Sequence, residues 1–349
     1  MSTKIKEAWF GPGRKDGQIR PITPKDDALH IDMGKKGTRE WWYFDARLDN
    51  GYTVVGFFRA KHERTGKTGV EITIYKPDGK KVQNVIDYPH STLIASKEIP
   101  DVQIGNNFIK VDYTSKELPI YEIFIDEGEF GFHLKYSAKV HGWKPGEGYI
   151  EFGKSKQFGW VIALPRAEVE GFIKVDGETI QVKGIGYHDH NWLNFNFALI
   201  IDYWYWGRIY SSEGSTVIFA YIKCNKRMEN YPIQVLMIAR NEKIYLSTGE
   251  YELVQDNFEY NDKADNEYPK SLVFSFGNGN KITIEVQEII DADNLLFELG
   301  IISRFLVKNL LRKKPGYFRL NSKFQLNLQF EGKSNIEKGT TLHEMVIAK

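Results

Sequence analysis

The chain has 349 residues, of which 42% are hydrophobic and 27% are charged. A single hydrophobic core seldom grows beyond about 250–300 residues, so this length predicts two domains. Lysine and arginine (47) nearly balance aspartate and glutamate (46). The net charge is therefore only +1, too small to attract the phosphate backbone of a nucleic acid, so we expect no nucleic-acid partner. No apolar run approaches the ~20 residues that span a bilayer.

The N-terminal sequence and the cysteine count indicate the cellular compartment in which the protein resides. Residues 1–17 carry charges and glycines where a secretory signal would need an apolar stretch of about 7–15 residues. Cys224 is the single cysteine of the chain, which excludes an internal disulfide and a multi-cysteine metal site. We therefore expect a cytoplasmic protein.

The predicted elements begin with an irregular lead-in over residues 1–39, which is rich in Gly, Pro and Lys. From residue 41 onward, short runs of Val, Ile, Tyr, Phe and Trp are separated by turn signals, which is typical of strands. The clearest strands are residues 51–61, 71–77, 106–113, 215–223 and 281–289. Hairpin turns are predicted at Asn50-Gly51, Asp78-Gly79, Asp176-Gly177 and Asn278-Gly279. The expected fold class is all-β, with strands closed into barrels or sandwiches.

A weak internal repeat supports two related domains. Residues 41–58 and 203–221 share an aromatic cluster, a short linker, a glycine turn and a β-branched strand. Two hairpins can resemble each other for local reasons alone, but tandem β-domains explain the order of all four features better. We predict domains over residues 40–198 and 199–349.

One strong helical pattern covers residues 292–313. Leucine and isoleucine recur at steps of three and four from Leu295 to Leu310, beside a basic stripe of Arg304, Lys308 and Arg312. The helix either packs across the open end of a barrel or rests on a membrane surface. The second alternative would make the protein a peripheral membrane protein.

Candidate chemistry concentrates in GIGYHDHNW, residues 184–192. If this run is a strand, His188, His190 and Trp192 lie on one face, and Tyr187, Asp189 and Asn191 on the other. Three uses remain open. Two histidines can share a metal, but no motif supplies further ligands, so we expect no metal. A carboxylate in an apolar pocket can act as a general acid. A buried polar network can also simply fix an interface.

Aromatic clusters indicate what the pocket holds. Residues 41–44 and 203–206, together with Trp192, offer more ring surface than two hairpins need. Part of this surface packs the core, and the remainder is suited to an apolar ligand and to a developing carbocation. Glu40 and Arg208 flank the clusters, either as solvated charges at strand ends or as a pair that orients a polar group of the ligand.

Three blocks of this sequence resemble a known family. REWWYFDARLDNGY (39–52), residues 158–192 and WYWGRI (204–209) are similar to the lipocalin-like superfamily of carotenoid 1,2-hydratases, which also includes kievitone hydratase and the fungal decalin-forming Diels–Alderases. The resemblance implies two tandem lipocalin-like β-barrels, a ligand pocket at or near their junction, and no metal or organic cofactor. Leu193 stands where the family run has glycine.

The resemblance also implies a function. The leading hypothesis is a cofactor-independent hydratase or cyclase of an isoprenoid or polyene. In it, Asp189 donates a proton, and His188 and His190 tune the acidity of Asp189. The alternatives are a pericyclase that shapes a polyene and a carrier that leaves its lipophilic ligand unchanged. The expected substrate-binding residues are Glu40, Trp42, Tyr187, Asn191, Trp192, Tyr203, Trp204, Trp206 and Arg208.

Overall fold

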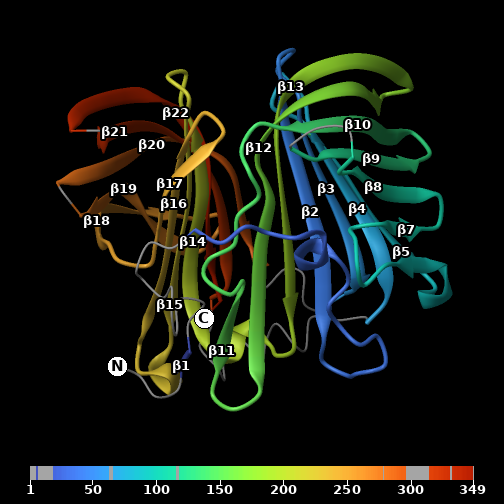
Figure 1. The fold of residues 1–349 in the computed structure, drawn as a ribbon, viewed down its shortest axis with the longest axis horizontal. Helices are drawn as coiled ribbons and strands as arrows, with labels where there is room; N and C mark the ends of the chain where they lie inside the picture. The colour runs from blue at the N-terminus through green and yellow to red at the C-terminus, as the bar shows by residue number, and fades with distance from the viewer. Residues whose placement is uncertain are drawn as a thin grey trace. The chain divides into compact units, whose positions relative to one another are not determined.

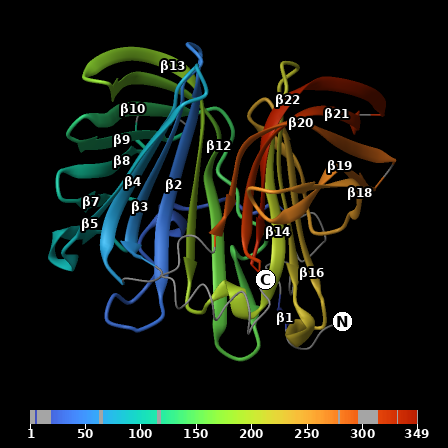
Figure 2. The ribbon, with the colours of Figure 1, turned by 180° about the vertical axis from the view of Figure 1, so that it is seen from behind.

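The computed structural model describes residues 5–6, 19–62, 66–114, 118–277, 279–295, 314–330 and 332–348. From residue 19 onward the chain divides into two compact units, residues 19–195 and residues 196–349. Each unit is built on one antiparallel sheet that curls into a half-barrel (Figures 1 and 2). The all-β prediction with two barrel-like domains is therefore confirmed.

The first domain contains a 13-stranded sheet whose main path runs β5-β4-β3-β2-β13-β12-β10-β9-β8-β7-β6, with β1 and β11 off this path. β13 is central, because it pairs with β2 on one side and with β12 on the other. The strands are β1 (Ile5–Lys6), β2 (Arg39–Leu48), β3 (Thr53–Lys61), β4 (Thr68–Tyr75), β5 (Lys81–Tyr88), β6 (Leu93–Ala95), β7 (Val102–Ile104), β8 (Asn107–Asp112), β9 (Ile120–Glu127), β10 (Phe130–Ala138), β11 (Tyr149–Phe152), β12 (Lys156–Val175) and β13 (Glu178–Leu193).

The second domain contains a nine-stranded sheet in the order β17-β16-β15-β14-β22-β21-β20-β19-β18. The first and last strands of the domain, β14 and β22, are neighbours in this sheet. The strands are β14 (Ile201–Tyr210), β15 (Ser215–Cys224), β16 (Pro232–Arg240), β17 (Lys243–Thr248), β18 (Glu252–Asn261), β19 (Asn266–Phe276), β20 (Asn280–Asn294), β21 (Gly316–Phe330) and β22 (Lys333–Ile347).

Alternation along the strands builds the core of each domain. In β2, Trp42, Phe44 and Ala46 are fully buried and belong to the core cluster of the first half-barrel. In β14, Tyr205 and Ile209 belong to the corresponding cluster of the second domain. Each cluster follows one face of its sheet, as the two-residue period of a strand requires.

The predicted strands and the predicted turns at Asn50-Gly51, Asp78-Gly79 and Asp176-Gly177 agree with the structure to within a few residues. Asn278 of the fourth predicted turn lies outside the described residues. Each of the five predicted strands corresponds to an observed one, namely β3, β4, β8, β15 and β20. A two-residue loop, Asp176-Gly177, joins β12 to β13, and both residues have positive φ, 55° and 78°. This is the conformation that a type I′ hairpin needs. The long hairpin carries GIGYHDHNW into the middle of the sheet.

Two other predicted regions differ in outcome. Residues 19–38 are irregular apart from a 3-10 turn, η1 (Pro24–Asp27), but they belong to the first compact unit. The helix predicted over residues 292–313 lies outside the described residues, except that residues 292–294 form the end of β20. Its membrane contact stays a prediction. Within the described parts of the chain, no helix has the length and hydropathy needed to cross a membrane.

Candidate active site

GIGYHDHNW lies in β13, and its side chains alternate as predicted. The rings of His188 and His190 stack on Phe44 and Trp42, which belong to the interior core of the first half-barrel. Asp189 therefore projects to the opposite face of the sheet. The segment builds two separate groups of polar contacts, one inside the half-barrel and one on its outer face.

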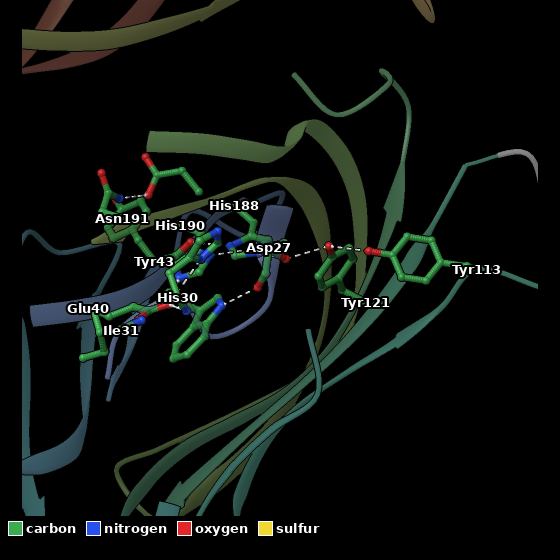
Figure 3. A network of polar contacts seen from close by, with 12 residues as sticks. Asp27, His30, Ile31, Glu40, Tyr43, Tyr113, Tyr121, His188, His190 and Asn191 are labelled. Carbon is green, nitrogen blue, oxygen red and sulfur yellow. Dashed lines mark hydrogen bonds and ion pairs between the residues drawn. The ribbon is translucent and has the colours of Figure 1, made fainter. Parts of the chain in front are cut away.

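The interior group is organised around His188 (Figure 3). Its Nε2 lies 2.9 Å from Oδ2 of Asp27, and its Nδ1 lies 2.9 Å from the backbone oxygen of Tyr43. The Tyr121 hydroxyl donates to the same Asp27 oxygen at 2.8 Å. The imidazole stacks on the Phe44 ring with centroids 3.9 Å apart and planes 10° apart. Ring packing and two opposed hydrogen bonds thus fix the orientation of His188.

Asp27 is a charged group in the domain interior. Its side chain is fully buried, and its backbone oxygen accepts a hydrogen bond from Trp42 Nε1 at 2.8 Å. Burial by itself raises the pKa of the Asp27 carboxyl, but the contact with His188 and the charge of His190 lower it well below its usual range. Asp27 is therefore an ionised acceptor and is unsuited to donating a proton.

His190 links the two buried carboxylates. Its Nε2 lies 2.8 Å from Oε1 of Glu40, and its Nδ1 lies 3.3 Å from Oδ1 of Asp27. These last two atoms make no hydrogen bond in the structure, so their attraction is ionic. Burial lowers the pKa of His190, but the contacts with Asp27 and Glu40 outweigh it and raise the pKa to about 9. His190 is therefore a buried imidazolium between two carboxylates.

Glu40 is held by the lead-in segment. The backbone amides of His30 and Ile31 each donate to one of its oxygens at 2.7 Å. His30, Glu40 and His190 place one possible metal-ligand atom each within 4.8 Å of one another. Both Glu40 oxygens already accept backbone hydrogen bonds, and His190 already pairs with one of them, so the group is satisfied as a hydrogen-bonded ion pair.

The His30 ring stacks on Trp192 with centroids 3.7 Å apart.

Asp189 organises the outer face. Its Oδ2 accepts hydrogen bonds from Trp160 Nε1 at 2.9 Å and from the Tyr187 hydroxyl at 2.8 Å, and its Oδ1 accepts one from the Asn191 amide at 2.8 Å. Burial raises the pKa of Asp189 to about 6, although these hydrogen bonds oppose the shift. A carboxyl with this pKa is protonated in about half of the molecules at pH 6 and in about a tenth of them at pH 7. Because Oδ2 already receives two donors, the proton belongs on Oδ1.

The strand next to Asp189 is irregular. On β12, Val161 pairs with His190 and Leu164 pairs with His188, so two residues of β12 face the single residue Asp189. This is a β-bulge, and a second bulge follows at the next pair. Bulges interrupt regular pairing and redirect side chains, and they are common beside active sites. Both bulges lie beside the Asp189 group.

A second carboxylate lies on the same outer face. In the β2–β13 register, Tyr43 is directly opposite Asp189, and Asp45 is directly opposite Tyr187. The Tyr43 hydroxyl donates to Oδ2 of Asp45 at 2.6 Å. Asp45 is buried, like Asp189. The outer face thus carries two tyrosine–aspartate pairs side by side.

The predicted binding residues fall into three places. Glu40, Trp42 and Trp192 belong to the interior of the first half-barrel. Glu40 and Arg208 are both buried, so the interpretation of these two residues as solvated charges at strand ends is wrong. Tyr187 and Asn191 lie with Asp189 on the outer face. The predicted residues of the second domain, Tyr203, Trp204, Trp206 and Arg208, all lie in β14. The Arg208 guanidinium lies 5.6 Å from the centroid of the Trp206 ring. The shared pocket at the junction stays a prediction.

Sequence reasoning missed several residues of both groups. Asp27 and His30 come from the lead-in, whose sequence has no periodicity to place them. Trp160 and Tyr121 come from strands without an unusual local pattern. Asp45 had a usable signal, because it lies two residues after Tyr43 and therefore on the same strand face.

Comparisons with known proteins agree with this architecture. The model of the Svf1 family matches residues 66–347. A protein of Chlorobaculum tepidum named hydroxyneurosporene dehydrogenase is 28% identical over 224 residues. That match covers 52% of this chain and 56% of the relative, so the chain spans little more than half the length of that protein. The relative supports the resemblance inferred from the three sequence blocks.

Solved structures share the fold at low sequence identity. A Nitrosomonas europaea protein described as AttH has a TM-score of 0.61 at 14% identity, covering 93% of this chain and 97% of its own. Kievitone hydratase from Nectria haematococca has a TM-score of 0.59 at 16% identity, with 94% of each chain covered. CghA, solved with Sch210972, has a TM-score of 0.60 at 11% identity, covering 99% and 98%. These similarities confirm the expected lipocalin-like fold.

Proposed function

This chain belongs to the Svf1 family, and on that premise we propose that it is an enzyme that hydrates or cyclises an apolar isoprenoid or polyene by protonating an alkene. One relative is named for hydroxyneurosporene, and one structural neighbour is a hydratase. The first name supports an apolar polyene substrate, and the second supports hydration as the reaction. The dehydrogenase activity in the first name is not part of the proposal. The observation that carries the proposal is the Asp189 group itself.

Asp189 has the properties of a general acid. It is buried, its pKa is raised to about 6, and a bulged strand lies beside it. A proton on Oδ1 is available for transfer, because the two strong donors hold the other oxygen. General acids contribute most when their pKa lies near the working pH. Asp27 lacks this property, since its carboxyl stays ionised.

The proposed reaction is redox-neutral. The Asp189 proton adds to one alkene carbon, the π electrons form the new C–H bond, and the other carbon becomes a cation. Aromatic rings of Tyr43, Tyr187 and Trp160 lie around the acid, and ring faces stabilise such a cation by roughly 0.5–2 kcal/mol each. Water adds to the cation and returns a proton to the Asp189 carboxylate, which restores the acid. In a cyclisation, a second double bond of the substrate replaces water as the nucleophile and forms a C–C bond and a new cation. That cation loses a neighbouring proton to the Asp189 carboxylate, which leaves an alkene and restores the acid.

The test uses deuterated water. We would incubate the full chain with squalene, lycopene and geranylgeraniol in detergent and analyse the products by mass spectrometry. The expected product carries a deuteron on carbon that exchange cannot remove, and Asp189→Asn should form none. Recovery of a bound but unchanged polyene would identify a carrier instead, and cyclisation without deuterium incorporation would identify a pericyclase.

A further inference from the structure

We propose that His188, held by Asp27, is a positioning residue for the Asp189 acid and that it acts through the backbone carbonyl of Tyr43. The inference deepens the proposed function and rests on it. It assigns a role to the interior group, which cannot reach a substrate at the outer face directly. It also gives a role to the lead-in segment, where Asp27 lies.

The geometry at His188 is that of a bridge. One ring nitrogen is 2.9 Å from the Asp27 carboxylate, and the other is 2.9 Å from the Tyr43 carbonyl oxygen. A carbonyl oxygen can only accept, so the Nδ1 hydrogen bond to Tyr43 requires a proton on that ring nitrogen. The Phe44 ring covers one face of the imidazole, and Tyr121 meets it edge-on at 5.1 Å. A ring held in this way has little freedom to tilt, and it fixes the carbonyl that it binds.

Tyr43 transmits that constraint to the other face of the sheet. It is the residue of β2 directly opposite Asp189. Its side chain projects to the outer face and binds Asp45. A shift of the Tyr43 backbone would therefore displace the acid, the neighbouring carboxylate and the ring between them. Misplacement by about 1 Å can lower a rate by about 100-fold.

Asp27 is itself firmly anchored. Its backbone oxygen binds the Trp42 indole, one carboxylate oxygen binds the Tyr121 hydroxyl, and the other lies 3.3 Å from His190. These three contacts come from different parts of the domain. The anchor therefore survives a change at His188, which makes a substitution there informative.

Two substitutions of His188 separate positioning from simple packing. Asparagine places an amide close to the position of Nδ1, so His188→Asn keeps a donor for the Tyr43 carbonyl and gives up the contact with Asp27. Glutamine reaches toward the position of Nε2, so His188→Gln keeps the contact with Asp27 and gives up the carbonyl. We expect His188→Gln to lower kcat by about 100-fold at unchanged KM. His188→Asn should stay within about threefold of the parent kcat, in line with its retained carbonyl contact.

A second readout is independent of substrate. Hydrogen–deuterium exchange of the full chain should accelerate at residues 39–48 and 186–193 in His188→Gln and stay near the parent rate in His188→Asn. The matched control is His343, another fully buried strand histidine, which bonds Ser322 in the second domain. His343→Gln and His343→Asn should leave both kcat and this exchange unchanged.

The outcomes are decisive. Equal loss of kcat in the two His188 variants, or full activity in both, would overturn the positioning role. Loss of kcat in the His343 variants would overturn it as well, because general destabilisation would then explain the effect. Full activity of Asp189→Asn would instead refute the proposed function. An inactive Asp189→Asn beside a fully active His188→Gln would refute only the inference drawn here.

Discussion

His188 and Asp189 are consecutive residues of β13, yet their side chains belong to different hydrogen-bond groups on opposite faces of the sheet. His188 bridges Asp27 and a backbone carbonyl in the interior. Asp189 accepts hydrogen bonds from Trp160, Tyr187 and Asn191 outside it. Two carboxyls that are both buried thus have opposite pKa shifts, lowered for Asp27 and raised for Asp189.

Asp189→Asn should abolish turnover while the fold survives. The amide has the same size and keeps an oxygen acceptor, but it cannot supply a proton. Loss of a general acid lowers rates by about 100- to 10,000-fold. Measuring both the turnover and the melting temperature of the variant checks this. An inactive variant that is also unfolded would count against a purely chemical role.

Turnover should fall as the pH rises through about 6, because Asp189 must be protonated to act. Tyr187→Phe removes a donor that stabilises the ionised carboxylate, so it should raise the pKa of Asp189 further. The pH–rate profile of this variant should retain activity to higher pH than the parent. A profile shifted to lower pH would contradict the assigned hydrogen bond.

Alkaline pH should destabilise the first domain through His190. Its folded pKa is raised from 6.5 to about 9, so its contribution is fully present below pH 6.5 and is lost as the pH rises through about 9. The shift corresponds to a loss on the order of 3 kcal/mol across this window. Urea unfolding at several pH values measures it. His190→Gln removes the titrating group, so its free energy of unfolding should depend less steeply on pH over the same window.

Gly159→Ala should destabilise the protein through a clash with Trp192. A Cβ at Gly159 would lie 2.0 Å from the indole, which stacks on His30. Overpacking of this kind costs about 1–3 kcal/mol. Gly277→Ala is the control, because a Cβ there meets no atom within 4 Å. Equal unfolding free energies for the two variants would contradict the packing described.

Much of the fold follows from local sequence. The hairpin at Asp176-Gly177 and the five strands were predictable because turn chemistry and residue alternation act over a few positions. The division of residues 187–192 between two faces follows from the same two-residue period. These features need no knowledge of what packs against them.

The partners of those residues were not predictable in the same way. Asp27 meets His188 across 161 positions of sequence, and no periodicity connects an irregular segment to a distant strand. Glu40 stands near the start of a strand, where the sequence alone suggests an exposed charge. In the structure it is buried, and the backbone amides of His30 and Ile31 donate to its carboxylate. Which charges are buried depends on tertiary packing, which local pattern does not encode.

The lead-in segment has a consequence for synthesis. A nascent chain that ends before β13 contains Asp27 and Glu40 but neither of the imidazoles that offset their charge. Burying these carboxylates at that stage would be strongly unfavourable. We therefore expect the N-terminal segment to dock only after β13 has left the ribosome, so that the site and the first half-barrel are completed in the same late step.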